Sequence, residues 1–321
     1  MKKLSIIVTA HNRKKYLPYA IKSILSSTKK IDDLEIIVVK NFEDEDLDSW
    51  LKSQNVKIFI TDQESLAAKQ VLGIVNAQGD LISFLEDDDM FALNKIHVLR
   101  KLLEYPDLDF FHHLVKPIKG DIYLSETVPF NDTDLEIFRV EDLENKVKLN
   151  YIIKKYHPEI YNSSKVISKD LARKCIDGLK GVDINTERFW FLCALEKGRL
   201  LAVTSSPLTL YRIHGESFSQ PNSKLFKVKL LERYIQSYIF MMKYFQKEIT
   251  KQILDEQYKL HIAHYLIYKK DERMKKLRLA LSLIGNSLKR STTYKEYSLL
   301  SALALLSSLA SISLARKILY R

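Results

Sequence analysis

The sequence contains few cysteines and few glycines. Cys175 and Cys193 are the two cysteines among 321 residues, and they do not form a Cys-x-x-Cys pair. We therefore expect neither a disulfide framework nor a cysteine metal centre, and a reducing cytoplasm suits the chain best. Of the 8 glycines, none lies in residues 9–13, the first predicted strand-to-helix turn. That turn therefore lacks the Gly-rich loop by which many phosphoryl-transfer enzymes hold phosphate.

Long hydrophobic runs are also rare. The apolar stretch at the start ends at Thr9, which is too short for a secretory leader, and we expect a first strand there. Residues 297–315 form the longest segment without a charge, but six of these nineteen residues are serine. The length approaches a bilayer span, yet the serines lower its hydrophobicity. We expect a packed or interfacial helix rather than a spanning one.

The positive charge is concentrated at one end of the chain. Residues 1–220 contain 31 Lys and Arg against 33 Asp and Glu, whereas residues 221–321 contain 20 against 7. A near-neutral first domain excludes nucleic acid as the main partner. The second region interleaves Tyr, Leu and Ile with Lys, which predicts amphipathic helices on an anionic membrane surface. A helical region that dimerises or covers the first domain is the alternative. The basic residues expected near lipid phosphates are Lys289, Arg290, Arg316 and Lys317.

Residues 1–220 alternate predicted strands and helices at the spacing of an α/β fold. We expect a doubly wound, mostly parallel, Rossmann-like sheet, with Asn12 capping the first helix. Residues 116–159 are polar and weakly periodic, and we expect an irregular insertion there. The predicted strands are residues 4–8, 34–39, 56–60, 81–85, 108–111 and 199–204, and the predicted helices are residues 17–25, 65–77, 93–105 and 187–196. The stretch at residues 210–214 completes this region.

Four consecutive acidic residues, Glu86 to Asp89, follow the buried strand predicted at residues 81–85. Adjacent carboxylates repel one another, and a cation such as Mg²⁺ or Mn²⁺ would relieve that repulsion. A solvated acidic turn before the next helix is an equal alternative. In such sheets ligands bind beyond the carboxyl ends of the strands, which places His11, Asn12 and Arg13, then Lys40 and Asn41, in the same crevice. The turn from Thr9 to Arg13 offers backbone amides and a cation to a diphosphate. The alternative is that it is an ordinary connecting turn between a strand and a helix.

Four fragments together resemble glycosyltransferase family 2, the inverting A-type nucleotide-sugar transferases. They are LSIIVTAHNRKKYLPYAIKSIL, LEIIVVKN, AQGDLISFLEDDD and LTLYRIHGESFS, and the match covers roughly residues 4–219. The resemblance implies that Asp88 binds a metal bridging the diphosphate, with Glu86 near the ribose or the metal and Asp87 in the donor site. The late Tyr-Arg-x-His segment implies that Arg212 contacts the donor and that His214 closes over the metal or diphosphate.

The resemblance also implies a catalytic base, which opens a helix that ends at a glycine about eleven residues on. Counting back from Gly198 places this base at Glu187. Asp183, in the turn before that helix, is the second choice. The alternative for both residues is that their negative charge only stabilises the N-terminus of the helix.

Two positions depart from the family pattern. Lys40 and Asn41 stand where an aspartate usually contacts the nucleotide base, so the base is not identified. Lys69 and Gln70 replace an Arg-Asn pair. Lys69 is a candidate for phosphate binding, although a solvated helix face is the favoured interpretation.

These features predict an enzyme that transfers a sugar from a nucleotide diphosphate sugar to a hydroxyl acceptor, with Mg²⁺ or Mn²⁺. The basic second region points to a glycan or lipid-linked acceptor at the inner face of the cell membrane. The alternatives are a nucleotidyl- or phosphotransferase on a similar sheet and a non-catalytic nucleotide-sugar-binding protein.

Overall fold

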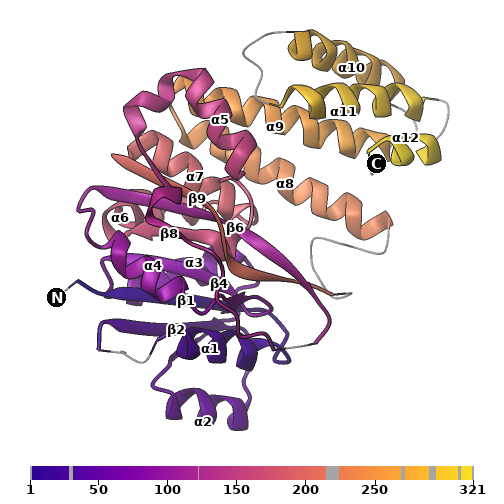
Figure 1. Cartoon of the computed structure of the whole chain (residues 1–321). Helices are drawn as coiled ribbons and strands as arrows, with labels where there is room; N and C mark the ends of the chain where they lie inside the picture. The colour runs from indigo at the N-terminus through magenta and orange to yellow at the C-terminus, as the bar shows by residue number, and fades with distance from the viewer. Residues whose placement is uncertain are drawn as a thin grey trace. The chain divides into compact units, whose positions relative to one another are not determined.

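The computed structural model describes residues 2–28, 32–121, 123–214, 224–268, 272–288, 294–309 and 312–319. The chain divides into two compact units, Met1–Ser217 and Phe218–Arg321. The first unit is built on a nine-stranded sheet and the second is helical, as Figure 1 shows. Each unit is described by itself.

Four parallel strands form the first half of the sheet, in the order β3-β2-β1-β4. Apolar residues occupy nearly every position of the two inner strands because helices cover both faces. All seven residues of β1 are buried. The strands are β1 (Leu4–Ala10), β2 (Leu34–Lys40), β3 (Lys57–Ile60) and β4 (Leu81–Glu86).

The second half of the sheet mixes strand directions. Strand β8 lies between β4 and β6 and runs antiparallel to both, whereas β6 and β9 are parallel. Strands β5 and β7 pair antiparallel with β9. Most paired residues belong to parallel ladders, and the expected fold class is confirmed. The strands are β5 (Met90–Phe91), β6 (Leu108–Lys119), β7 (Leu135–Arg139), β8 (Lys165–Ser168) and β9 (Leu200–Ile213).

Helices cover the two faces of this sheet (Figure 1). Apolar residues of α1 and α4 form one core with Leu4, Ile6 and Val8 of β1. On the other face Phe84 stacks on Trp190 of α7, with ring centroids 5.9 Å apart. The helices of this unit are α1 (Leu17–Ser26), α2 (Glu45–Ser53), α3 (Leu66–Asn76), α4 (Lys95–Leu102), α5 (Lys146–Tyr156), α6 (Lys169–Leu179) and α7 (Thr186–Lys197).

Two expectations about local structure are wrong. The segment at residues 116–159 is not irregular, because it contains the end of β6, all of β7 and α5. Strand β7 lies at the margin of the sheet with several exposed positions, which leaves no strong apolar alternation. Asn12 does not cap α1 either. Tyr16 holds the N-cap position without a side-chain cap, and Asn12 has a φ of 53°.

The second unit contains five helices in its described residues. Helix α11 packs against α9, α10 and α12, and α8 packs against α9. Ser298 and Ser301 of α11 are buried, so the polar side of the uncharged segment faces the interior of this unit. None of the described helices is long and apolar enough to cross a membrane. The helices are α8 (Lys224–Tyr244), α9 (Glu248–Ile267), α10 (Arg273–Leu288), α11 (Lys295–Ser308) and α12 (Ile312–Leu319). The prediction for Lys289 and Arg290, and for the side chains of Arg316 and Lys317, lies outside the described residues.

Two helical glycines provide a test of the packing of α3 on the sheet. A Cβ on Gly73 would lie 2.5 Å from Cγ2 of Ile7, whereas one on Gly285 of α10 would meet no atom within 4 Å. We expect Gly73→Ala to lower the free energy of unfolding by about 1–3 kcal/mol through overpacking. Gly285→Ala should raise it by up to about 1 kcal/mol, because alanine favours the helix. Urea unfolding of both variants measures this, and equal effects would contradict the packing described.

Candidate functional site

The acidic turn lies between β4 and β5 and is tied to three other parts of the first unit. The amide of Asp87 donates to the carbonyl of Thr9 on β1, at 3.1 Å. The amide of Glu86 donates to Oγ of Ser163, at 3.0 Å, and the amide of Arg212 donates to Oδ1 of Asp89, at 3.0 Å. The carboxylates are therefore held by contacts from β1, β9 and the short 3-10 helix η3 (Asn162–Ser164).

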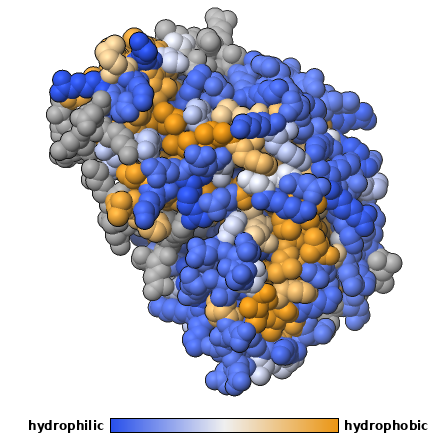
Figure 2. Space-filling model, turned by 180° about the vertical axis from the view of Figure 1, so that it is seen from behind, coloured by the Kyte–Doolittle hydropathy of each residue, from blue (hydrophilic) through white to orange (hydrophobic). Residues whose placement is uncertain are grey.

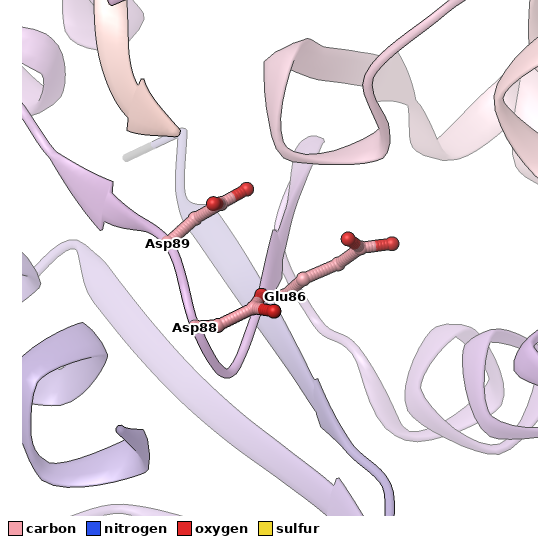
Figure 3. A group of neighbouring side chains, drawn as sticks. All are labelled: Glu86, Asp88 and Asp89. Atoms are coloured by element: carbon pink, nitrogen blue, oxygen red, sulfur yellow. The ribbon is translucent and has the colours of Figure 1, made fainter. Parts of the chain in front are cut away.

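Three carboxylates of this turn converge. Glu86, Asp88 and Asp89 each offer an oxygen, and these oxygens lie within 4.8 Å of one another (Figure 3). Clustered carboxylate oxygens are the ligands that Mg²⁺ and Mn²⁺ prefer. The residues present thus fit a divalent cation. Asp88 and Glu86 were expected here, whereas sequence reasoning assigned Asp89 no role.

Arg13 and His214 contact carboxylates of the acidic turn. Arg13 binds Asp87 through two bonds, of 2.9 and 2.8 Å, and reaches Oδ2 of Asp88 at 2.7 Å. Nε2 of His214 lies 2.9 Å from that Oδ2 atom and 3.4 Å from Nη1 of Arg13. The structure thus brings together four of the predicted residues, Arg13 from the turn after β1, Asp87 and Asp88 from the acidic turn, and His214 directly after β9.

The pKa values of the acidic turn show a shortage of positive charge. Burial, and then the charges of Asp88 and Asp89, raise the pKa of Glu86 well above its ordinary value. Burial, and then the charge of Asp88, raise the pKa of Asp89 to about 8. For Asp88, burial acts upward, but the bond from His214 and the charge of Arg13 outweigh it and lower the pKa. A divalent cation would stabilise the ionised forms of the carboxylates that Arg13 does not reach.

A pair of asparagines connects the turns that follow β1 and β2. The amide of Asn12 donates to Oδ1 of Asn41 at 2.8 Å, and Nδ2 of Asn41 donates to Oδ1 of Asn12 at 2.7 Å. The carboxyl ends of β1 and β2 are therefore locked together. His11 precedes Asn12, and its Nδ1 atom lies 3.2 Å from Nζ of Lys69.

Two lysines occupy different surroundings from those expected. Lys69 is 1% exposed, and its ammonium donates to the carbonyls of Gln63 and Glu64 at 2.8 and 3.1 Å. The favoured solvated helix face is therefore wrong for Lys69, and burial lowers its pKa. Lys40 is fully buried, and its ammonium pairs with Asp48 at 2.8 Å. Its charge is neutralised by α2 and not by the acidic turn.

Arg212 is buried and hydrogen-bonds to the backbone of the acidic turn. It is 1% exposed, and its Nε donates to the carbonyl of Asp88 at 2.9 Å while Nη1 donates to the carbonyl of Gly120. Its guanidinium also lies over the ring of Tyr16, 4.8 Å from the centroid. These contacts orient the backbone that carries Asp88.

The two candidate bases lie at the start of α7. Glu187 is in the first helical turn and is partly exposed. Burial raises its pKa, and Arg188 and Lys165 act against that rise. The charge of Glu187 in turn raises the pKa of Glu86, so the two carboxyls interact. The backbone carbonyl of Asp183 accepts a bond from Oγ of Ser65 at 3.1 Å, which ties that turn to α3.

Ser163 and Asn162 are site residues that sequence reasoning missed. Ser163 bonds the acidic turn, and Nδ2 of Asn162 lies 3.5 Å from Oε1 of Glu86. Both residues belong to η3, which follows a non-glycine residue with positive φ, Tyr161 at 59°. Such strained backbone clusters at functional sites, but it carries no signal in the sequence.

Parts of the chain are similar in sequence to curated proteins. The chain is 34% identical over 114 residues to an uncharacterized glycosyltransferase of Rickettsia conorii, in an alignment covering 34% of this chain and 18% of that protein. It is 29% identical over 151 residues to an uncharacterized glycosyltransferase of Haemophilus influenzae, covering 45% and 49%. The chain therefore matches less than half the length of either relative.

Solved structures share the fold. S. aureus TarS 1–349 in complex with UDP-GlcNAc superposes with a TM-score of 0.60 at 14% identity, covering 99% of this chain and 90% of that one. The mannosyltransferase PcManGT from Pyrobaculum calidifontis, in complex with GDP-Man and Mn²⁺, gives a TM-score of 0.57 at 13% identity, covering 96% and 87%. The family model Glycosyl transferase family 2 matches residues 5–165, which include the acidic turn and η3. Since that match spans half of the chain, the protein belongs to glycosyl transferase family 2.

Proposed function

We propose that the protein moves a sugar from a nucleotide diphosphate sugar to a hydroxyl acceptor in one inverting displacement. The carboxylate cluster of Glu86, Asp88 and Asp89 carries this proposal, because it offers hard oxygen ligands beside the carboxyl ends of β1 and β4. Two proteins of the same fold bind UDP-GlcNAc and GDP-Man, which are both nucleotide diphosphate sugars. That similarity supports a donor of the same chemical class here.

The donor diphosphate would bind in the turn from Thr9 to Arg13. Arg13 is 19% exposed at its side chain and presents a fork of N–H donors that suits phosphate oxygens. The ammonium of Lys69, which contacts His11 of the same turn, would add a second positive charge. Asn12 and Asn41 border the position where the base would lie, and the buried Lys40 sits behind them.

The cation we propose is Mg²⁺ or Mn²⁺, held by Asp88 and Glu86 with Asp89 and His214 beside them. When bound, such an ion neutralises the charge that develops on the departing diphosphate. The solved structure of PcManGT is a complex with GDP-Man and Mn²⁺, which supports this choice. Arg13 also binds Asp88, so it would share that carboxylate with the ion or turn toward the donor.

Glu187 is the proposed base that removes the proton from the acceptor hydroxyl. Its raised pKa moves it toward neutral pH, where a general base combines correct protonation with proton affinity. The charge interaction between Glu187 and Glu86 supports a base near the carboxylate cluster. Asp183 is the alternative base.

The acceptor is proposed to be a glycan or lipid-linked glycan at the inner membrane face. On α10, Met274, Leu277 and Leu281 are exposed by 62%, 37% and 61% at a helical spacing. Arg273 and Arg278, also exposed, flank this stripe. Figure 2 shows apolar and hydrophilic side chains alternating over the surface of this unit. Apolar residues between cations match the chemistry of an anionic lipid surface.

Donor turnover tests the assignment of Glu187. We expect the wild type to hydrolyse or transfer from one member of a panel of UDP- and GDP-sugars, with Mg²⁺ or Mn²⁺. Glu187→Gln should lower kcat by about 10²- to 10⁴-fold with the donor Kd nearly unchanged, because only the proton acceptor is lost. Asp88→Asn should instead weaken metal-dependent donor binding. Asp183→Asn is the matched control, and a larger loss there would move the base to Asp183. Binding without turnover indicates a non-catalytic protein, and no donor binding at all rules out the transferase.

The raised pKa of Asp89, about 8, generates a prediction for stability. Between about pH 4 and pH 8 the folded protein keeps a proton that the unfolded chain releases, so the free energy of unfolding falls as pH rises through that window. Asp89→Asn carries no such proton. Its Tm without metal should therefore gain on the wild type as pH rises, and Mn²⁺ should reduce the difference. Asp132→Asn changes an exposed carboxyl as a control. Parallel pH curves for Asp89→Asn and wild type would refute the assignment.

Liposome co-sedimentation tests the lipid surface. We expect binding to phosphatidylglycerol vesicles at low salt, release at high salt, and no binding to phosphatidylcholine. Leu281→Glu should weaken binding, whereas Val147→Glu on α5, 79% exposed, should not. Absence of binding at low salt contradicts the proposal. A dimer that Leu281→Glu dissociates would identify a second copy of the chain as the partner.

A further inference from the structure

A chain of buried side-chain hydrogen bonds leads from α7 to Glu86. Nε1 of Trp190 donates to Oε1 of Gln70 at 3.0 Å, and Nε2 of Gln70 donates to Oδ1 of Asn162 at 3.0 Å. Nδ2 of Asn162 then donates to Oγ1 of Thr186 at 3.1 Å and approaches Oε1 of Glu86 at 3.5 Å. Trp190, Gln70 and Thr186 are fully buried, and Asn162 is 5% exposed. We call Trp190, Gln70 and Asn162 the relay.

The direction of every bond in the relay follows from the indole. A tryptophan N–H can only donate, so the amide of Gln70 must present its oxygen to Trp190 and its nitrogen to Asn162. Asn162 must then accept with its oxygen and present its NH₂ group to Thr186 and Glu86. Reversing either amide would place two donors or two acceptors face to face in a buried site, which costs about 1–3 kcal/mol per unsatisfied group. The relay therefore presents a donor to Glu86.

The relay joins the two parts of the site that must be correctly spaced. Thr186 and Trp190 lie one turn apart on α7, so the relay holds that helix at two points beside Glu187. Glu86 lies at the end of β4, and its amide is bonded to Ser163, the neighbour of Asn162. Gln70 adds α3 to the assembly. Four elements separated in sequence thus meet through two amide side chains.

We propose that Gln70 and Asn162 are positioning residues, which orient the carboxylate of Glu86 toward the cation and set its distance from Glu187. This inference rests on the proposed function, because it needs a cation at the carboxylate cluster. Groups that hydrogen-bond to a metal-binding carboxylate fix its orientation, and their loss typically weakens metal binding by 10- to 100-fold. The relay acts only through Glu86 and α7 and has no described contact with Asp88 or Asp89.

The rival explanation is that the relay only satisfies buried polar groups and stabilises the fold. The two explanations differ in what a variant changes. A purely structural role lowers Tm without altering the affinity of the folded protein for a cation. A positioning role lowers that affinity at temperatures where the variant is fully folded.

Mn²⁺ binding provides the test, measured by electron paramagnetic resonance with UDP or GDP present. Asn162→Leu removes both the donor and the acceptor and should weaken Mn²⁺ binding by about 10-fold. Trp190→Phe keeps an aromatic ring but removes the N–H that orients Gln70, and should weaken binding in the same direction by less. Because Trp190→Phe changes so little volume, it guards against a failure of Asn162→Leu to fold.

The chain offers matched controls for both changes. Trp50→Phe alters the other tryptophan, on α2, and Asn94→Leu removes an asparagine that bonds Val128. Both controls should bind Mn²⁺ as the wild type does. Wild-type affinity in Asn162→Leu and Trp190→Phe, with only Tm lowered, overturns the inference while leaving the transferase intact. If the wild type itself binds neither Mn²⁺ nor nucleotide, the proposed function fails and the relay loses its role with it.

Discussion

The crowding of four consecutive carboxyl groups at the end of β4, where Asp87 and Asp89 are buried and Glu86 and Asp88 are partly buried, is the constraint on which the site depends. Buried like charges are costly, and three of these carboxyls contact cationic or polar groups from other parts of the unit. Arg13 binds Asp87 and Asp88, His214 contacts Asp88, and the amide of Arg212 bonds Asp89. Glu86 and Asp89 nevertheless keep raised pKa values, so Arg13 alone does not balance the charge. A divalent cation beside Glu86 and Asp89 would complete the charge balance.

The two halves of the sheet contribute different segments to this site. The parallel half, with β1, β2 and β4, delivers the turn from Thr9 to Arg13 and the acidic turn to the same edge. The mixed half surrounds that turn with η3, before β8, and with the end of β9. Helix α7 completes the site, and the relay connects it to both halves. Loss of order in η3 would therefore affect the cation, the base and the packing of α7 together.

Much of the first unit could be predicted from residue patterns. The strands at residues 4–8, 34–39 and 81–85 are continuous apolar runs, and such runs in alternation with amphipathic helices predict a parallel sheet. The acidic turn was found because four charges directly after a buried strand are unusual, and the family resemblance then selected Asp88 and Glu86 within it. Residues 116–159 were misjudged, since β7 and α5 show weak periodicity and owe their structure to contacts with β9. Lys69 was misjudged because a lysine at a helix start is usually solvated, whereas here His11 and two carbonyls enclose it.

The sequence by itself determined the local features: the apolar strands, the acidic turn, the family to which the chain belongs, and a second region that is basic and helical. These features depend on the residue types within short segments of the chain, and folding does not alter them. The tertiary structure alone decided which distant side chains come into contact. Asn162 and Gln70 are 92 residues apart, and Arg13 and His214 are 201 apart. No spacing rule connects such pairs, because their contact depends on the order of strands in the sheet and on the path of the segments between them.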